Sequence, residues 1–282
     1  MEVGLGSINP HAIEIGSFVI HWYGVIIAAA IVLAIHLSTR EAKKKGLEED
    51  IIIDMALWAI PIGFIGARLY YVLFELDYYL QNPGEIVAIW NGGIAIYGGL
   101  IAGGLTLYWY TNKKGVSLSL LVDILAPNVL LAQAIGRWGN FINQEAHGGP
   151  VSYAFLEKLY LPKFIIEQMN IKGTYYHPTF LYESLWSVVG FGLIILLRNR
   201  KNMLRQGEVA LSYVLWYSVG RFFIEGMRTD SLWIGDLMRV SQALSLVLFI
   251  GAILIWYLRR QDYPPIPYYS KGRETKKLRS LV

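Results

Sequence analysis

The chain has no cysteine among its 282 residues. It therefore forms no disulfide, offers no thiolate to a metal ion and has no cysteine nucleophile of its own. Its five histidines are scattered without the spacing of metal ligands, which argues against a zinc site. No segment interleaves basic and aromatic residues in the manner of a nucleic-acid-binding surface, so we predict no nucleic-acid partner.

Charge is scarce as well. Only 16% of the residues are charged, whereas a soluble domain usually carries about a quarter. Hydrophobic residues make up 55% of the chain, and the aromatic residues include 9 Trp and 19 Tyr. Tryptophan and tyrosine collect where a protein meets the two membrane interfaces. The composition therefore indicates a protein that lies in a lipid bilayer.

Long apolar runs fill most of the sequence. A helix rises about 1.5 Å per residue, so roughly 20 apolar residues are needed to cross a hydrocarbon core about 30 Å thick. Seven stretches qualify: Ser17–Thr39, Ile51–Phe74, Gly92–Tyr110, Leu118–Phe141, Pro178–Leu197, Val209–Glu225 and Val240–Leu258. The fourth and the sixth are the weakest, because each has polar groups near one end. We predict an all-α polytopic membrane protein with about seven transmembrane helices.

Basic residues predict the orientation of this protein, because Lys and Arg collect in cytoplasmic loops. Residues 40–50 hold four, 111–117 two, 198–207 four and 259–282 seven, whereas 75–90 hold none. The N-terminus is therefore expected outside and the C-terminus in the cytoplasm. The first run is too long for a cleaved signal peptide, and its basic cluster follows the run instead of preceding it.

We divide the chain into one transmembrane domain, residues 1–258, and a basic cytoplasmic tail, residues 259–282. From Asp262 onward this tail is expected to be mobile, and its basic residues to touch anionic lipid headgroups. Residues 142–177 form the one long connection and lie outside in this topology. Within it, Ser152–Met169 places apolar side chains at helical spacing, which predicts an outer-face arm in the membrane interface; an ordinary ordered loop is the alternative.

Small residues recur in the third apolar run. Ala95, Gly99 and Gly103 are spaced four apart, with Gly98 and Gly104 beside them. Such a ladder lets neighbouring helices approach closely. The glycines also resemble a phosphate-binding loop, but no strand precedes them, so we favour the packing interpretation.

Several arginines stand inside or beside the apolar helices. An arginine at mid-membrane costs at least about 2.5–3.5 kcal/mol on insertion scales, so it requires a partner or a wet cavity. Arg68, Arg137 and Arg221 each fall late in a helix that runs from inside to outside in the predicted topology, and Arg228 and Arg239 follow closely. We therefore predict a shared polar cavity that opens to the outer face.

The spacing within two helices supports this cavity. Tyr217, Arg221, Glu225 and Arg228 form one stripe of a helix, and Gln133, Arg137 and Asn140 form another. Guanidinium groups match pairs of phosphate oxygens, and nearby glutamates can orient them. The set predicts recognition of a phospholipid phosphate; the alternative is a group of structural ion pairs such as Arg221–Glu225.

Several motifs in the chain closely resemble the prolipoprotein diacylglyceryl transferases. The densest is Gly136-Arg137-Trp138-Gly139-Asn140-Phe141-Ile142-Asn143-Gln144-Glu145, followed by Gly148. Further matches occur in order at His21–Gly24, Gly66–Arg68, Gly93–Leu100, His177–Glu183 and Arg221–Arg228. The resemblance covers most of the chain from residue 17 to about 258.

This resemblance implies a bacterial plasma-membrane enzyme with its active site near the outer face. Such enzymes move the diacylglyceryl group of phosphatidylglycerol to the thiol of the lipobox cysteine in a prolipoprotein signal peptide. A thioether forms and glycerol phosphate leaves, with no metal or organic cofactor. The positions in this chain that match functional positions of the family are Tyr23, Arg137, Asn140, Glu145, Gly148, Tyr217, Arg221 and Glu225.

On this basis Arg137 and Arg221 are expected to bind the headgroup phosphate and stabilise the leaving group. Glu145 and Glu225 would orient them, with Glu145 a candidate proton acceptor. Arg68 and Arg228 are expected to assist binding.

One departure concerns Tyr97. Some family members have a histidine at this position, proposed as the base, whereas tyrosine side chains ordinarily have a pKa near 10 and are poor bases at neutral pH. Either the base lies elsewhere or the field of the site activates the thiol.

Two other functions stay open from the residues alone. A transferase acting on another lipid phosphate usually needs an acidic metal-binding cluster, and none is evident on the outer side. A transporter would show charges spread through the bilayer or inverted repeats with broken helices. The concentration of charge at the outer helix ends argues against a transporter.

Overall fold

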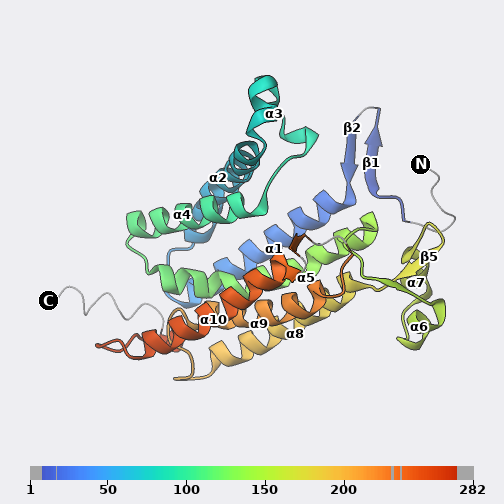
Figure 1. The fold of residues 1–282 in the computed structure, drawn as a ribbon. Coiled ribbons are helices and arrows are strands. Elements are labelled where there is room, and N and C mark those ends of the chain that lie inside the picture. The colour runs from blue at the N-terminus through green and yellow to red at the C-terminus, as the bar shows by residue number, and fades with distance from the viewer. Residues whose placement is uncertain (1–7, 17, 230–231, 236, 272–282) are drawn as a thin grey trace. The chain divides into compact units, whose positions relative to one another are not determined.

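The computed structural model describes residues 8–16, 18–229, 232–235 and 237–271 (Figure 1). Helices dominate this part of the chain. The seven longest are α1 (Trp22–Lys44), α2 (Ile51–Phe74), α4 (Ile96–Lys114), α5 (Leu118–Asn143), α8 (Thr179–Asn199), α9 (Glu208–Glu225) and α10 (Val240–Arg260). All seven predicted apolar runs therefore fold as helices, and the bounds of α2 match the prediction residue for residue.

Five of these helices, among the residues described, are long and apolar enough to cross a membrane: α1, α2, α5, α8 and α10. The chain is thus a mostly helical, polytopic membrane protein. The two others are α4, which is rich in glycine and tyrosine, and α9, which carries Glu208, Arg221 and Glu225. The apolar run that forms α5 was expected to be one of the two weakest candidate spans, whereas α5 is among these five helices. Seven spans and the orientation of the termini stay predictions.

The fold is not purely helical. Two short antiparallel hairpins join β1 (His11–Ile15) to β2 (Phe18–His21) and β6 (Trp233–Ile234) to β7 (Met238–Arg239). A third sheet has the order β3-β5-β4, built from Pro150–Val151, Thr174–Tyr176 and Asn170–Ile171. The first hairpin explains why α1 begins at Trp22, later than expected, since residues 18–21 pair as a strand; Ser17 lies outside the described residues.

The chain divides into two compact units. One comprises residues 1–37 and 123–282, and the other residues 38–122. The second unit holds α2 and α4, the short helix α3 (Leu76–Gln81) and the 3-10 turns η1 (Pro83–Val87) and η2 (Ile89–Asn91). Here α4 begins at Ile96 and not at Gly92, because Gly92 and Gly93 adopt φ angles of 85° and 75° that end regular structure.

Glycines bring α2 and α4 into close contact. A side chain at Gly98 would place its Cβ 2.3 Å from the carbonyl oxygen of Gly66, and one at Gly99 would lie 3.4 Å from that of Gly63. This supports the close-packing interpretation, but Gly98 and Gly99 make the contact and Gly103 does not. Gly103, expected in the ladder, has no atom within 4 Å of the position a Cβ would take.

The arm at 142–177 folds as a small lobe. Its expected single helix is two short ones, α6 (Tyr153–Lys158) and α7 (Lys163–Gln168), separated at Tyr160, which has a φ of 53°, and at Pro162. The lobe has its own core, shared with the end of α5 and the start of α8: Phe141, Leu156, Ile165, Ile166, Met169 and Phe180. Its location in a membrane interface stays a prediction.

The start of the tail was expected to be mobile, but it packs against the residues that precede α9. Tyr269, in the 3-10 turn η3 (Tyr269–Lys271), is fully buried. Its backbone N–H donates to the Leu204 carbonyl at 2.8 Å, and that of Gln206 donates to the Pro267 carbonyl at 2.9 Å. The short run before α9 therefore holds the chain after α10 in place. The rest of the predicted tail, residues 272–282, lies outside the described residues.

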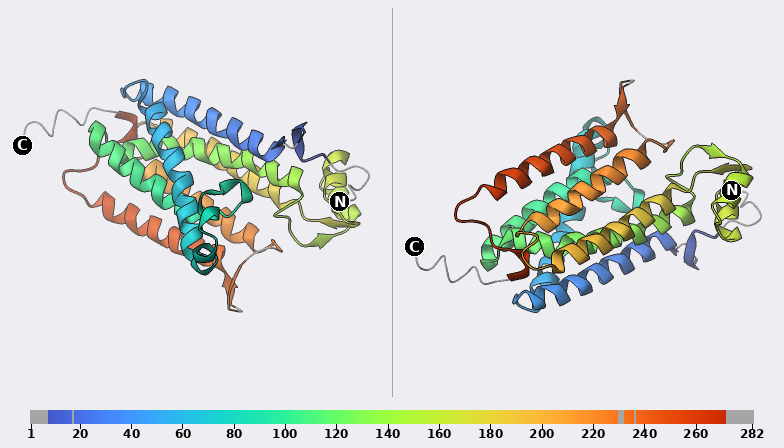
Figure 2. Two further views of the ribbon diagram at one scale, coloured as in Figure 1. Left: turned by 90° about the horizontal axis from the view of Figure 1, so that it is seen from above. Right: turned by 90° about the horizontal axis from the view of Figure 1, so that it is seen from below.

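Helices α8 and α9 lie side by side (Figure 2), and a pair of tryptophans stabilises their contact. The rings of Trp186 and Trp216 stack with centroids 4.3 Å apart. Each indole N–H donates to the backbone carbonyl of the other tryptophan, at 2.9 and 2.8 Å. Gly190 and Gly220, each one turn after a tryptophan, leave room for the opposite ring.

We expect Gly190→Ala to lower the free energy of unfolding by about 1–3 kcal/mol, as overpacking usually does. A Cβ there would lie 2.2 Å from the Trp216 Nε1, which two-way hydrogen bonding holds in place. Thermal unfolding in detergent measures the change. Gly192→Ala in the same helix is the control, because nothing lies within 4 Å of its Cβ position. Equal melting temperatures for the two variants would contradict the prediction.

Candidate active site

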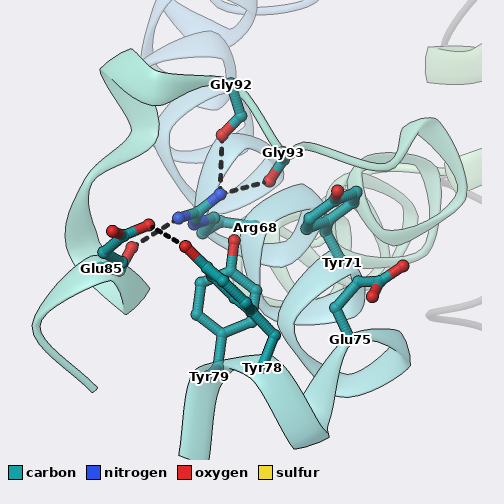
Figure 3. A pocket seen from close by; sticks show the side chains of 8 residues that line it. All are labelled: Arg68, Tyr71, Glu75, Tyr78, Tyr79, Glu85, Gly92 and Gly93. Atoms are coloured by element: carbon teal, nitrogen blue, oxygen red, sulfur yellow. Dashed lines mark hydrogen bonds between the residues drawn. The ribbon is translucent and has the colours of Figure 1, made fainter. Parts of the chain in front are cut away.

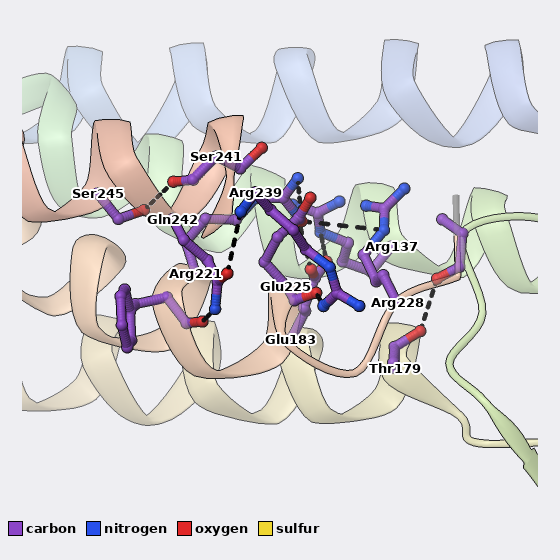
Figure 4. A network of polar contacts seen from close by, with 12 residues as sticks. Arg137, Thr179, Glu183, Arg221, Glu225, Arg228, Arg239, Ser241, Gln242 and Ser245 are labelled. Atoms are coloured by element: carbon purple, nitrogen blue, oxygen red, sulfur yellow. Dashed lines mark hydrogen bonds and ion pairs between the residues drawn. The ribbon is translucent and has the colours of Figure 1, made fainter. Parts of the chain in front are cut away.

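Three helices of the larger unit bring charged side chains together around Glu183. This residue lies near the start of α8, and its side chain is only 9% exposed. Its Oε2 lies 2.5 Å from Nε of Arg137 on α5, and its Oε1 accepts a hydrogen bond of 3.0 Å from Nη1 of Arg221 on α9. One carboxylate therefore connects two guanidinium groups from different helices (Figure 4).

A second carboxylate extends the cluster along α9. Glu225 is buried, and its Oε2 lies 2.7 Å from Nη2 of Arg221 and 4.0 Å from Nε of Arg228. Arg239, at the start of α10, donates through Nη1 to the Glu225 backbone carbonyl and lies over the Trp233 ring, 5.1 Å from its centroid. Arg221 is thus held by one glutamate on each side.

The cluster carries an excess of positive charge. Four guanidinium groups, those of Arg137, Arg221, Arg228 and Arg239, accompany the two carboxylates of Glu183 and Glu225. Within the described part of the chain, Arg137 uses only its Nε, and Figure 4 shows its terminal nitrogens turned away from Glu183. Its side chain remains 22% exposed. The two terminal amino groups of Arg137 are therefore available for an anion, and the ion pair with Glu183 fixes the plane of the guanidinium group.

The aromatic and amide residues of the two predicted stripes lie around this cluster. A Cβ on Gly139 would fall 2.5 Å from the Tyr23 ring, so this glycine lets α1 approach α5. On the other side, Gln133 Nε2 donates to the Tyr213 hydroxyl at 3.0 Å, and Tyr213 stacks on Tyr217 with centroids 6.0 Å apart. These contacts fix Gln133 and Tyr217, which lie one helical turn before Arg137 and Arg221.

The loop after α5 packs against the end of α9. Its Gly148 forms a β-bridge with Arg228, and a Cβ there would lie 2.6 Å from that of His177 and 3.1 Å from the Met227 carbonyl oxygen. Gly148 is therefore required by packing. Thr179 secures the same loop by donating to the Ala146 carbonyl at 2.6 Å.

Two polar residues of the Gly136–Glu145 motif line a small cavity after Arg137 in the chain. Asn140 and Glu145 line a cavity of about 10 Å³ together with His147 and Thr179. The Glu145 backbone N–H donates to the Asn140 carbonyl at 3.0 Å. His177 packs against Gly148, and burial lowers the pKa of this histidine below its ordinary value.

The structure brings together four of the expected residues: Arg137, Arg221, Glu225 and Arg228. Glu145 differs from expectation, because its carboxylate is exposed and lies 3.5 Å from Asn143 Nδ2 instead of holding an arginine. Glu183 holds that place. It ends the His177–Glu183 motif, and a buried carboxylate in the first turns of an apolar helix was the signal that could have identified it.

Arg68 lies in the smaller unit and is engaged by backbone carbonyls (Figure 3). It donates to Glu85, Ile86, Gly92 and Gly93 at 2.5–2.9 Å, which uses four of its five N–H groups. A pocket of about 360 Å³ lies beside it. Arg68 therefore holds the backbone of residues 85–93 in place, whereas the contacts of Arg137 leave its terminal amino groups available.

Two further tyrosines lie in the smaller unit. Tyr97, the residue in place of the family's histidine, is 38% exposed near the start of α4. Tyr78 donates its hydroxyl to Glu85 at 2.9 Å, and the carboxylate raises the pKa of that phenol above its ordinary value. Among the residues described, no three His, Cys, Asp or Glu side chains come close enough to hold a metal ion.

The chain is thus a polytopic membrane protein that collects arginines from separate helices around two buried carboxylates, with an excess of positive charge. The family model described as prolipoprotein diacylglyceryl transferase matches residues 10–258. This chain belongs to that family.

Similar curated proteins span nearly its whole length. A protein of Lactobacillus acidophilus is 55% identical over 95% of this chain and 96% of its own. Proteins of Listeria monocytogenes and Listeria innocua are 55% and 56% identical, each over 97% of both chains. All three are named phosphatidylglycerol--prolipoprotein diacylglyceryl transferase.

Proposed function

We propose that this chain transfers the diacylglyceryl group of phosphatidylglycerol to the lipobox cysteine thiol of a prolipoprotein. The names of its relatives support the two substrates. The single observation that carries the proposal is the Glu183 carboxylate that joins Arg137 to Arg221. It fixes two cations beside each other with a free fork on Arg137, which suits a phosphodiester headgroup.

The reaction follows from the charges of this cluster. The substrate thiolate attacks the glyceryl CH₂ carbon, a C–S bond forms, and the C–O bond to phosphate breaks. The bonding electrons pass to the phosphate oxygen, so negative charge grows on the departing glycerol phosphate. Arg137 and Arg221 stabilise this charge, and a preorganised donor of this kind typically contributes about 2.7–4 kcal/mol. The chemistry requires no metal or organic cofactor.

The remaining residues have supporting roles in this proposal. Glu183 and Glu225 orient the two arginines, and Arg228 adds positive charge at the end of α9. Tyr23, Asn140 and Tyr217 form the walls around the headgroup, and Gly148 permits the loop to close on α9. Glu145 lines the small cavity beside Asn140, and Arg68 keeps residues 85–93 folded.

We further propose that the protein lies in the bacterial plasma membrane as one transmembrane domain, with its arginine cluster near the outer face. The arm at 142–177 would then lie at the outer interface, and the basic tail in the cytoplasm. The alternation of basic residues between successive connections supports this orientation.

The direct test is mass spectrometry of a lipobox peptide after incubation with the purified protein and phosphatidylglycerol vesicles. We expect a mass gain of one diacylglyceryl unit, which a chelator does not prevent. A peptide with serine in place of the lipobox cysteine is the control. Transfer from a polyprenyl phosphate in its place, or solute flux in proteoliposomes without lipidated peptide, would contradict the proposal.

The absence of native cysteine allows a test of topology. Tyr160, 95% exposed in the arm, and Lys201, exposed between α8 and α9, are each replaced by cysteine. We expect a membrane-impermeant maleimide to label Tyr160→Cys in intact spheroplasts, and Lys201→Cys only after permeabilisation. The unmodified chain is the blank. The reverse pattern would overturn the proposed orientation.

A further inference from the structure

The loop between α5 and β3 contains a histidine to which the reaction above assigns no role. Nδ1 of His147 lies 3.0 Å from the carbonyl oxygen of Gly148. A carbonyl oxygen only accepts hydrogen bonds, so in the neutral ring Nδ1 carries the proton and Nε2 keeps a lone pair. This loop therefore presents the tautomer that can take up a proton at Nε2.

Backbone contacts place His147 next to the segment that carries Arg228. Gly148 pairs with Arg228 in a β-bridge, and the Gly149 N–H donates to the Met227 carbonyl at 3.1 Å. Thr229 Oγ1 lies 3.5 Å from the carbonyl oxygen of His147 itself. The histidine is thus fixed beside the end of the helix that contributes Arg221 and Glu225.

A second connection reaches the cluster from α8. Thr179 donates to Ala146, the residue before His147, and lies one turn before Glu183 on α8. Figure 4 draws this contact in the same view as the network around Glu183. The histidine backbone is therefore tied both to α8 and to the end of α9.

The ring of His147 is held on one face and lines a cavity. It packs on the Tyr176 ring with centroids 4.1 Å apart. It borders the small cavity that Asn140 and Glu145 also line. The charged and titratable groups around it are Glu145 in its own loop, Tyr176 on β5, His177 after β5 and Arg228 after α9.

We infer that His147 is the general base of the proposed transfer, an inference that rests on that proposed function. Its Nε2 accepts the proton of the substrate S–H group, and the resulting thiolate attacks the glyceryl carbon as described. The phosphate oxygen takes the electron pair of the broken C–O bond, and the imidazolium returns its proton to water. Imidazole is suited to this step because it titrates between pH 5 and 8, which answers the question left by Tyr97.

The test is His147→Asn in the full-length protein, measured with phosphatidylglycerol vesicles and a lipobox peptide across pH 6.5–9.5. Asparagine retains an N–H that can donate to the Gly148 carbonyl but offers no base. We expect kcat at pH 7 to fall about 100-fold, the lower end for loss of a general base. The deficit should shrink above about pH 8.5, where the substrate thiol ionises by itself. A purely structural role would give a deficit that does not change with pH.

His177→Asn is the matched control, since this histidine packs against Gly148 and has its Nδ1 3.3 Å from the Tyr182 hydroxyl. It should keep the pH profile of the unaltered protein. An unchanged rate for His147→Asn at pH 7, or a pH-independent loss, would overturn the inference. So would a pH-dependent loss of this kind in Glu145→Gln or Tyr97→Phe instead. An unaltered protein that lipidates no peptide would refute the proposed function itself.

Discussion

Replacing Arg137 by alanine is expected to lower kcat for diacylglyceryl transfer by about 10²–10³, the usual loss for a key donor to a developing charge. Arg137 offers the two terminal nitrogens that no contact among the described residues engages, while Glu183 holds its Nε at 2.5 Å. Without the fork, the charge on the leaving phosphate is stabilised by Arg221 and its neighbours alone. Initial rates of peptide lipidation measure the loss.

A lysine at the same position separates charge from geometry. Arg137→Lys keeps one positive charge but cannot contact two phosphate oxygens with a planar fork, so it should recover only a small part of the rate. Arg200→Ala is the control, because it removes an exposed arginine just after α8. Near-normal transfer by Arg137→Ala would show that the headgroup binds elsewhere.

The second large effect is expected for Glu183→Gln. The amide is nearly isosteric but uncharged, so it loses the ion pairs to Arg137 and Arg221. The two guanidinium groups then repel each other and lose their fixed orientation. We expect kcat to fall about 100-fold, within the range for a disturbed oxyanion-type site. KM for phosphatidylglycerol should change much less, because the positive charge that attracts the headgroup remains.

Stability must be separated from catalysis in this variant. Breaking a buried ion pair by removing one partner typically costs about 3–5 kcal/mol. Glu208→Gln is a matched control at the start of α9, where Glu208 is almost fully buried and lies 2.7 Å from both Nε and Nη2 of Arg260. It should share the loss of stability but keep kcat per folded molecule. A similar fall in kcat for both variants would show that Glu183 matters only for folding.

The sequence predicted the arginine cluster from depth and direction. Arg137 and Arg221 fall late in helices that were expected to run the same way, and the structure brings them to one carboxylate. The same argument did not hold for Arg68, whose donors are used by carbonyls of residues 85–93. Helix position indicates how deep a side chain lies but not which neighbour receives it.

The sequence by itself determined the class of protein, the seven long helices and the family. The free energy of burying about 20 apolar residues is a nearly additive sum over neighbouring residues of the chain. The sequence therefore predicted both ends of α2 correctly. Only the tertiary structure decided that Glu183 and not Glu145 pairs with Arg137, that the arm breaks into two helices, and that Tyr269 is buried. These outcomes depend on partners far apart in the chain, such as Glu183 and Arg221, which are separated by 38 positions, and no local pattern specifies such a pairing.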